Sequence, residues 1–213
     1  MEVGGLTPFT LADFPGEVAC IVFTQGCNLS CPFCHNKALI PIVSTGNSFK
    51  GVRPFLEKRR GILSGVVISG GEPTIQEDLE ESIAQIKEMG FKVKLDTNGT
   101  NPQVIEKLLK RGLIDLVAMD IKAPLEKYHH LCGLKVDTGR IKDSLAIIAE
   151  SGTPHYFRTT LVPGLLDRAD VGAIRGLLPP GAPHVVQPFR SVADKGKEVL
   201  TIGNMGHLAK EER

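Results

Sequence analysis

Residues 23–36 read FTQGCNLSCPFCHN, and three of the five cysteines of this 213-residue chain lie in this run. The run follows a short apolar segment, Val18 to Phe23, that is expected to form a β-strand. A structural zinc site or an ordinary four-cysteine cluster takes four protein ligands, whereas a catalytic metal site keeps one position open. Cys27, Cys31 and Cys34 supply only three thiolates. The loop is therefore interpreted as the site of an iron–sulfur cluster with one iron free to bind a small molecule.

Two other metal sites could use the same cysteines. A zinc ion would need His35 as its fourth ligand, and the adjacency of His35 to Cys34 makes joint tetrahedral coordination awkward. Residues 31–35 also spell CxxCH, the motif for covalent attachment of haem c. Haem c requires export, no signal peptide is recognised, and Cys27 would have no role. The iron–sulfur interpretation is favoured over both.

Composition predicts a soluble globular protein, with 42% hydrophobic and 23% charged residues and a net charge of +1. One domain over residues 1–213 is expected, with a core at about 11–190 and a loosely held C-terminal tail. The lack of a long basic run argues against a nucleic-acid partner. No signal peptide or membrane-spanning run is recognised, which predicts no membrane partner and a cytoplasmic location, where clustered cysteines usually bind metal.

The rest of the chain alternates between strand-like runs and helical periodicity. Strands are expected at residues 17–23, 65–69, 91–95, 114–121, 155–161 and 184–189, with helices between them. This alternation indicates a parallel sheet of right-handed βαβ units that curves towards a barrel. Six strands are too few for an eight-stranded barrel. The predicted fold class is therefore α/β, an incomplete (βα)6 parallel barrel with an open side.

Polar residues and glycines gather where the predicted strands end. In parallel α/β barrels the active site is assembled at that rim, so a single site is expected there. The residues at these strand ends are Gly70 to Glu72, Asp96 to Asn98, Asp120 with Lys122, Arg158 and Gln187. Three of these motifs could instead be purely structural. The paired glycines could form a tight turn, residues 96–98 a turn and helix cap, and Asp120 with Lys122 an ion pair.

In combination these motifs resemble the radical S-adenosylmethionine (SAM) superfamily, which joins CxxxCxxC, an aromatic residue before the last cysteine and Gly-Gly-Glu-Pro after the second strand. Further motifs resemble the glycyl-radical-enzyme activating enzymes. Among these the chain is most similar to the activating protein of anaerobic ribonucleoside-triphosphate reductase, with the pyruvate formate-lyase activating enzyme as a near relative. The motifs are DFPG at 13–16, QGC at 25–27, CPFCHN at 31–36, GGEP at 70–73, LDTNG at 95–99 and MDIK at 119–122.

The resemblance implies a fold of radical SAM type and a role for each cysteine. Cys27, Cys31 and Cys34 would hold three irons of a [4Fe-4S] cluster, and the amino and carboxylate groups of SAM would chelate the fourth. Reductive cleavage of SAM would release methionine and a 5′-deoxyadenosyl radical. The protein would hold the cluster next to SAM, and the two cofactors would carry out the chemical reaction.

The same resemblance implies contacts with SAM on the cluster side of the site. Gly70 and Gly71 would let the backbone approach the methionine part, and Glu72 would bind its ammonium group. Phe33 and His35 would lie beside the adenine.

Residues of the later strands would complete the SAM site. Asp96, Asn98, Asp120 and Lys122 would line the methionyl and ribose side, with Lys122 suited to the carboxylate. In relatives the aspartates at these strand ends can also help to hold a monovalent cation. Arg158 is a candidate for contact with SAM or with a partner protein.

The expected function is that of a radical SAM activase, which abstracts a hydrogen atom from a glycine of a partner enzyme. The expected partner is anaerobic ribonucleoside-triphosphate reductase, and reduced flavodoxin or a similar donor would supply the electron. Alternatives are a pyruvate formate-lyase activating enzyme or another radical SAM enzyme. A non-catalytic metal-binding module is the alternative from a different class.

Overall fold

A seven-stranded sheet in the order β1-β2-β3-β4-β5-β6-β7 dominates the computed structural model, which describes residues 1–190. The strands are β1 (Val3–Thr10), β2 (Ala19–Thr24), β3 (Gly65–Gly70), β4 (Lys92–Thr97), β5 (Leu116–Asp120), β6 (His155–Leu161) and β7 (His184–Pro188). The α-helices are α1 (Phe49–Lys58), α2 (Leu79–Glu88), α3 (Pro102–Lys110), α4 (Tyr128–Cys132), α5 (Thr138–Glu150) and α6 (Arg168–Leu177). Three short 3₁₀ helices are η1 (Lys37–Leu39), η2 (Pro73–Ile75) and η3 (Leu125–Lys127).

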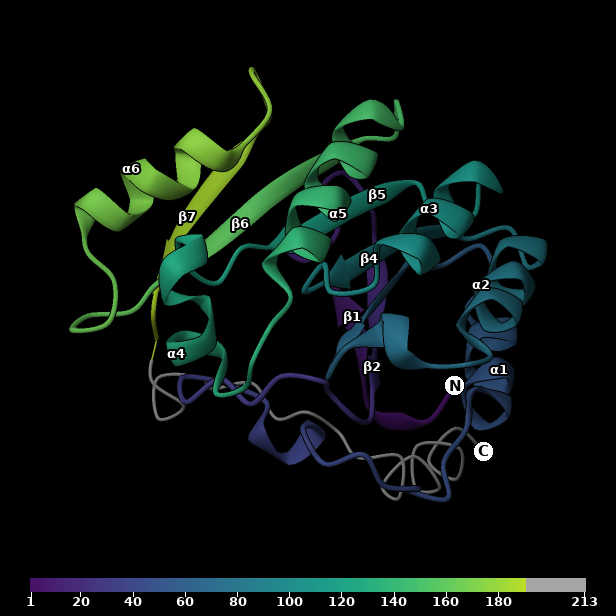
Figure 1. Cartoon of the computed structure of the whole chain (residues 1–213). Helices are drawn as coiled ribbons and strands as arrows, with labels where there is room; N and C mark the ends of the chain where they lie inside the picture. Colours follow the sequence, from purple (N-terminus) through teal and green to yellow (C-terminus); the bar gives the residue numbers. More distant parts are fainter. Residues whose placement is uncertain (191–213) are drawn as a thin grey trace.

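Strands β2 to β7 are parallel and follow one another in chain order, which confirms the predicted incomplete parallel barrel. The apolar runs of β2, β3 and β5 suit strands that are covered on both faces. Figure 1 shows α1, α2, α3, α5 and α6 along the outer side of the curved sheet, whereas α4 lies at its lower end, where Cys132 contacts Ser30. A large apolar core lies between these helices and the strands.

Strand β1 is a seventh strand that the sequence pattern does not predict. It pairs antiparallel with β2 at one edge of the sheet, with two irregularities in its register. Its sequence, VGGLTPFT, contains two glycines and a proline, which are depleted in strands. An edge strand tolerates them because one side of its backbone makes no ladder hydrogen bonds.

The inner side of the curved sheet is apolar at one end and charged at the other. Phe14, Ala19, Ile21 and Val67 form a separate small apolar cluster. The Phe14 ring lies so close to Gly65 that a side chain at residue 65 would meet it. The carboxyl ends of the strands, in contrast, carry the polar residues of the predicted site. Hydrophobic side chains therefore fill one end of the curved sheet, and the polar residues of the predicted site lie at the other end.

The expected single domain over residues 1–213 stays a prediction, and its C-terminal tail lies outside the described residues. None of the helices between residues 1 and 190 has the length and apolarity needed to cross a lipid bilayer.

Candidate active site

A cavity of about 310 Å³ lies at the carboxyl ends of the strands. It is of the size that holds small molecules in proteins. Asp13, which precedes β2, and Gln187, on β7, both line it, so the sheet curves far enough for its two ends to share one site. Every predicted site residue lines this cavity: Cys27, Cys31, Phe33, Cys34, His35, Gly70, Gly71, Glu72, Asp96, Asn98, Asp120, Lys122 and Arg158. Their individual roles stay predictions.

The cysteine loop is held in shape by the protein's own hydrogen bonds. The backbone N–H groups of Gly26 and Cys27 donate to Leu39 and Ile40 at 2.9 and 3.0 Å, and Cys34 N–H donates to the Cys31 carbonyl at 3.0 Å. The far end of the loop is tied to α4, because Ser30 N–H donates to the Cys132 carbonyl at 2.8 Å. These hydrogen bonds hold the backbone of the loop that carries the three cysteines.

The thiols of the loop differ in their surroundings. Burial raises the pKa of the Cys27 thiol to about 11, although the Leu29 N–H donates to its sulfur at 3.4 Å. A hydrogen bond from the Cys132 thiol lowers the pKa of Cys31. Cys132 lies buried at the end of α4.

The paired glycines are required by the fold itself. A Cβ on Gly71 would overlap the carbonyl oxygen of Gly26, and one on Gly70 would overlap the backbone of Thr24. Gly70 also has φ +115°, a conformation that residues with side chains rarely adopt. The space next to these glycines is thus taken by the strand that leads into the cysteine loop. Contact of their backbone with a ligand stays a prediction.

Glu72 is a buried carboxylate that accepts four hydrogen bonds. Thr74 donates to it through its N–H at 3.1 Å and its hydroxyl at 2.6 Å, the Thr97 hydroxyl donates at 2.7 Å, and Asn98 N–H donates at 2.7 Å. Burial raises the pKa of Glu72, and these hydrogen bonds oppose that effect. Among residues 1–190, no lysine or arginine pairs with this carboxylate. A buried carboxylate with no cationic partner is suited to a positively charged ligand group.

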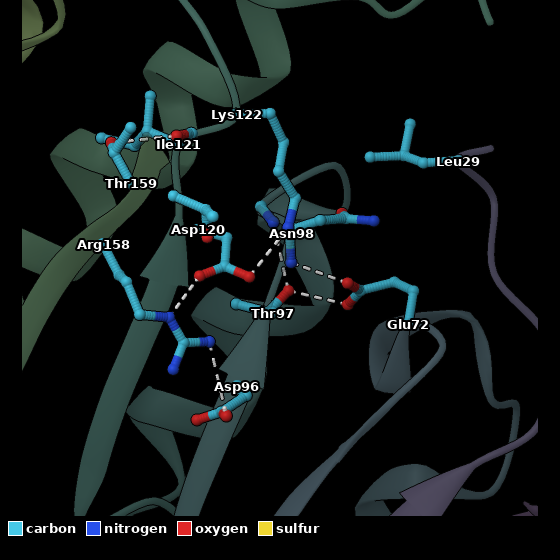
Figure 2. Close-up of polar contacts among 12 residues, drawn as sticks. Leu29, Glu72, Asp96, Thr97, Asn98, Asp120, Ile121, Lys122, Arg158 and Thr159 are labelled. Carbon is cyan, nitrogen blue, oxygen red and sulfur yellow. Dashed lines mark hydrogen bonds and ion pairs between the residues drawn. The ribbon is translucent and has the colours of Figure 1, made fainter. Parts of the chain in front are cut away.

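Arg158 lies between two carboxylates, as Figure 2 shows. Its Nε donates to Asp120 Oδ1 at 2.6 Å, and its terminal nitrogen Nη2 lies 3.6 Å from Asp96 Oδ2. The strands place them there, because Asp120 and Arg158 are register partners of β5 and β6. Asp120 raises the pKa of Arg158.

Lys122 is the third charged group of this cluster. Its Nζ lies 2.8 Å from Asp120 Oδ2, so the structural ion pair considered from the sequence is present and lines the cavity. Burial alone would raise the pKa of Asp120, but the positive charges of Lys122 and Arg158 outweigh it and hold that pKa below its usual range. Asp120 is therefore ionised at neutral pH.

Lys94 is a site-supporting residue that sequence reasoning missed. Its side chain is only 1% exposed, its ammonium contacts Asp96 Oδ1, and it lies 5.5 Å from the centre of the Tyr156 ring. Successive side chains of a strand alternate in direction, so a lysine two residues before Asp96 faces the same side. That spacing was the signal in the sequence that could have revealed Lys94.

Asn98 and His35 line the cavity but also make contacts with the protein. The Asn98 amide donates to Asn28 Oδ1 at 2.9 Å and accepts from Thr100. The His35 ring stacks on Phe189 with centroids 5.0 Å apart, and its Nε2 donates to the Arg190 carbonyl. Contacts within the protein therefore already hold these two side chains, which the family resemblance places beside SAM.

The donor set fits the expected cluster. Cys27, Cys31 and Cys34 all line one cavity, together with the buried Glu72 and with Lys122. Within the part of the chain that the structure describes, no three His, Cys, Asp or Glu side chains are gathered around a single metal ion.

A monovalent cation does not fit between the aspartates in this arrangement. Lys94 contacts Oδ1 of Asp96, and Arg158 lies near Oδ2. Arg158 donates to Oδ1 of Asp120, and Lys122 pairs with Oδ2. Each of the four carboxylate oxygens thus already faces a cationic group.

Comparison with sequence families gives a match of residues 21–174 to the model of the radical SAM superfamily. A protein of Methanocaldococcus jannaschii, named as a candidate glycyl-radical enzyme activating enzyme, is 36% identical over 192 residues, covering 88% of this chain and 79% of that protein. The pyruvate formate-lyase-activating enzyme of Streptococcus mutans is 32% identical over 183 residues, covering 78% of this chain and 67% of that enzyme.

Solved structures with the same fold are more distant in sequence. TYW1 with a bound lysine–pyruvate adduct has a TM-score of 0.62 at 21% identity, over 91% of this chain and 72% of that one. SuiB of Streptococcus suis bound to its precursor peptide SuiA has a TM-score of 0.64 at 18% identity, over 90% of this chain and 44% of that one. At these identities the likeness is one of fold alone.

Proposed function

Because this chain belongs to the radical SAM superfamily, and within it to the glycyl-radical enzyme activating enzymes, we propose that it generates a glycyl radical on anaerobic ribonucleoside-triphosphate reductase. One observation carries this proposal. The three loop cysteines, the buried Glu72 and the charged residues at the ends of β4 to β6 all line a single cavity. Together they offer a cluster site and a SAM site in contact with each other.

The cysteine loop would hold the [4Fe-4S] cluster through Cys27, Cys31 and Cys34. With one electron from an external donor, the bound cluster and SAM would supply the radical chemistry that takes a hydrogen atom from glycine. The protein's own task is to bind and orient SAM. Glu72 would accept from its ammonium group and Lys122 would pair with its carboxylate, since each offers the complementary charge at the cavity wall.

A protein substrate is compatible with the open sheet. Strands β1 and β7 stand at opposite edges of the sheet order, and the cavity includes Thr160 of β6 and Gln187 of β7. A loop that carries the target glycine would reach the cavity from this side. The electron would come from a separate donor such as reduced flavodoxin, as the family resemblance implies.

The test is anaerobic reconstitution of the cluster, reduction, and addition of SAM with the candidate reductase. A glycyl radical detected by electron paramagnetic resonance on the reductase supports the proposal. The matched comparison is pyruvate formate-lyase under the same conditions, because the 32% identity to a lyase-activating enzyme favours that partner as the second candidate. A radical on the lyase alone would mean that the partner is wrong and the activase function correct.

Glu72→Gln is expected to weaken SAM binding by about 10- to 100-fold, because a hydrogen bond to a charged group is worth roughly 1.5–3 kcal/mol. The measurement is equilibrium dialysis of labelled SAM against the protein with its cluster oxidised. Glu77→Gln is the control, since Glu77 is exposed and outside the cavity. If Glu72→Gln lowers the unfolding temperature but binds SAM as the unmodified protein does, then Glu72 is structural and the assigned contact is wrong.

A further inference from the structure

The aspartates at the ends of β4 and β5 are balanced by side chains of the protein itself. Arg158 reaches both of them, at 2.6 Å to Asp120 and 3.6 Å to Asp96. Lys94 contacts the other oxygen of Asp96, and Lys122 the other oxygen of Asp120 at 2.8 Å. The cluster therefore contains three cationic and two anionic side chains.

This charge balance opposes an added metal cation. Two carboxylates alone would attract Na⁺ or K⁺, but three cations beside them leave a net positive charge. An inorganic cation placed next to Arg158 would meet a like charge in a partly desolvated site, where repulsion is stronger than in water. An anionic ligand group would instead be attracted.

The positions of the cations are set by the fold and not by flexible surface side chains. Lys94 is almost completely buried against Tyr156, and its ammonium has Asp96 as its charged partner. The Arg158 side chain is 21% exposed and is the register partner of Asp120 across β5 and β6. Loss of Asp96 would leave the buried Lys94 without its charged partner. Asp96 is therefore needed to balance the charge of Lys94.

We propose that Arg158 takes the place of a monovalent metal cation between Asp96 and Asp120, with Lys94 positioning Asp96, so that SAM binding does not depend on Na⁺ or K⁺. This inference rests on the proposed function, since it concerns the SAM site. It makes Arg158 and Lys94 positioning residues that orient the two carboxylates.

The test compares SAM binding to the cluster-loaded protein in choline, sodium and potassium chloride at equal ionic strength, which holds screening constant. The dissociation constant is expected to agree within about twofold among the three salts, well below the tenfold that one lost ionic contact would produce. A dissociation constant that is about tenfold higher in choline than in sodium or potassium would overturn the proposal.

Arg158→Met is the variant used in the second part of the test, because it removes the guanidinium group and keeps an apolar side chain. Binding in choline is expected to weaken about tenfold, and sodium or potassium should restore most of it, since the freed carboxylates can then accept an inorganic cation. Arg158→Lys retains the charge and should stay insensitive to the salt. Arg175→Met, at an exposed position of α6, is the matched control and should behave like the unmodified protein. An Arg158→Met protein that is equally weak in all three salts contradicts the proposal.

A second readout does not require SAM. The unfolding temperature of the cluster-free unmodified protein should be the same in the three salts, and that of Arg158→Met should rise in sodium or potassium relative to choline. If the loaded protein binds no SAM in any salt, the proposed function fails, and these unfolding temperatures still decide whether Arg158 replaces a cation. A salt-dependent unfolding temperature for the unmodified protein would overturn the inference by itself.

Discussion

Replacing Cys31 by alanine is expected to reduce SAM cleavage to below about one thousandth of the unmodified rate, which corresponds to an activation barrier raised by roughly 4 kcal/mol. Cys31 is the most buried of the three loop cysteines and lies between the core and the cavity. Without its thiolate only two cysteines of the loop remain, and two cannot hold three irons. The measurements are the iron content after reconstitution and the yield of 5′-deoxyadenosine.

Cys20→Ala is the matched control for this change. Cys20 is fully buried in β2, where it packs as a small apolar residue outside the cavity. Its loss should cost about 1 kcal/mol of stability and leave cleavage intact, because only packing is removed. Cleavage that survives Cys31→Ala with a full complement of iron would contradict the assignment of the cysteine loop.

Gly71→Ala is expected to destabilise the fold by at least about 3 kcal/mol, since an added methyl group would overlap backbone atoms that cannot move away independently. The Cβ would meet the carbonyl of Gly26 and approach that of Leu39, and both belong to the frame of the cysteine loop. The free energy of unfolding from urea titration measures the effect. Because the displaced segment carries Cys27, cluster incorporation should fall as well.

Gly172→Ala shows whether this effect is specific. Gly172 lies in α6, and a Cβ there would have no neighbour within 4 Å. Alanine at a helical position is favoured over glycine by about 0.5–1 kcal/mol, so this variant should be slightly more stable. A Gly71→Ala protein as stable as the unmodified protein would contradict the requirement for glycine at residue 71.

The sequence predicted the strands of the barrel well because their residues follow simple rules. Buried parallel strands such as Val66–Ile68 need continuous apolar residues, and glycines mark the turns between elements. The cavity lining could likewise be predicted, since motifs that follow successive parallel strands must meet at one edge of the sheet. Cys27 and Arg158, which are far apart in the sequence, line the same cavity for this reason.

Other features depend on tertiary contacts that local patterns do not contain. Strand β1 gains its conformation from pairing with β2 despite its glycines and Pro8. Lys94 looks like a surface residue in the sequence, and only the partners Asp96 and Tyr156 explain its burial. The glycines of GGEP appeared to serve a ligand, whereas the structure shows that they first make room for the neighbouring backbone.

The most direct test of the account is the electron paramagnetic resonance spectrum of the reduced, reconstituted protein before and after SAM is added. The central claim is a four-iron cluster held by Cys27, Cys31 and Cys34, with its remaining position open to SAM. It predicts a [4Fe-4S]⁺ signal whose shape changes when SAM binds, with coupling to isotopes placed in the amino and carboxylate groups of SAM. A signal that SAM leaves unchanged, or a mononuclear metal with a fourth protein ligand, would contradict it.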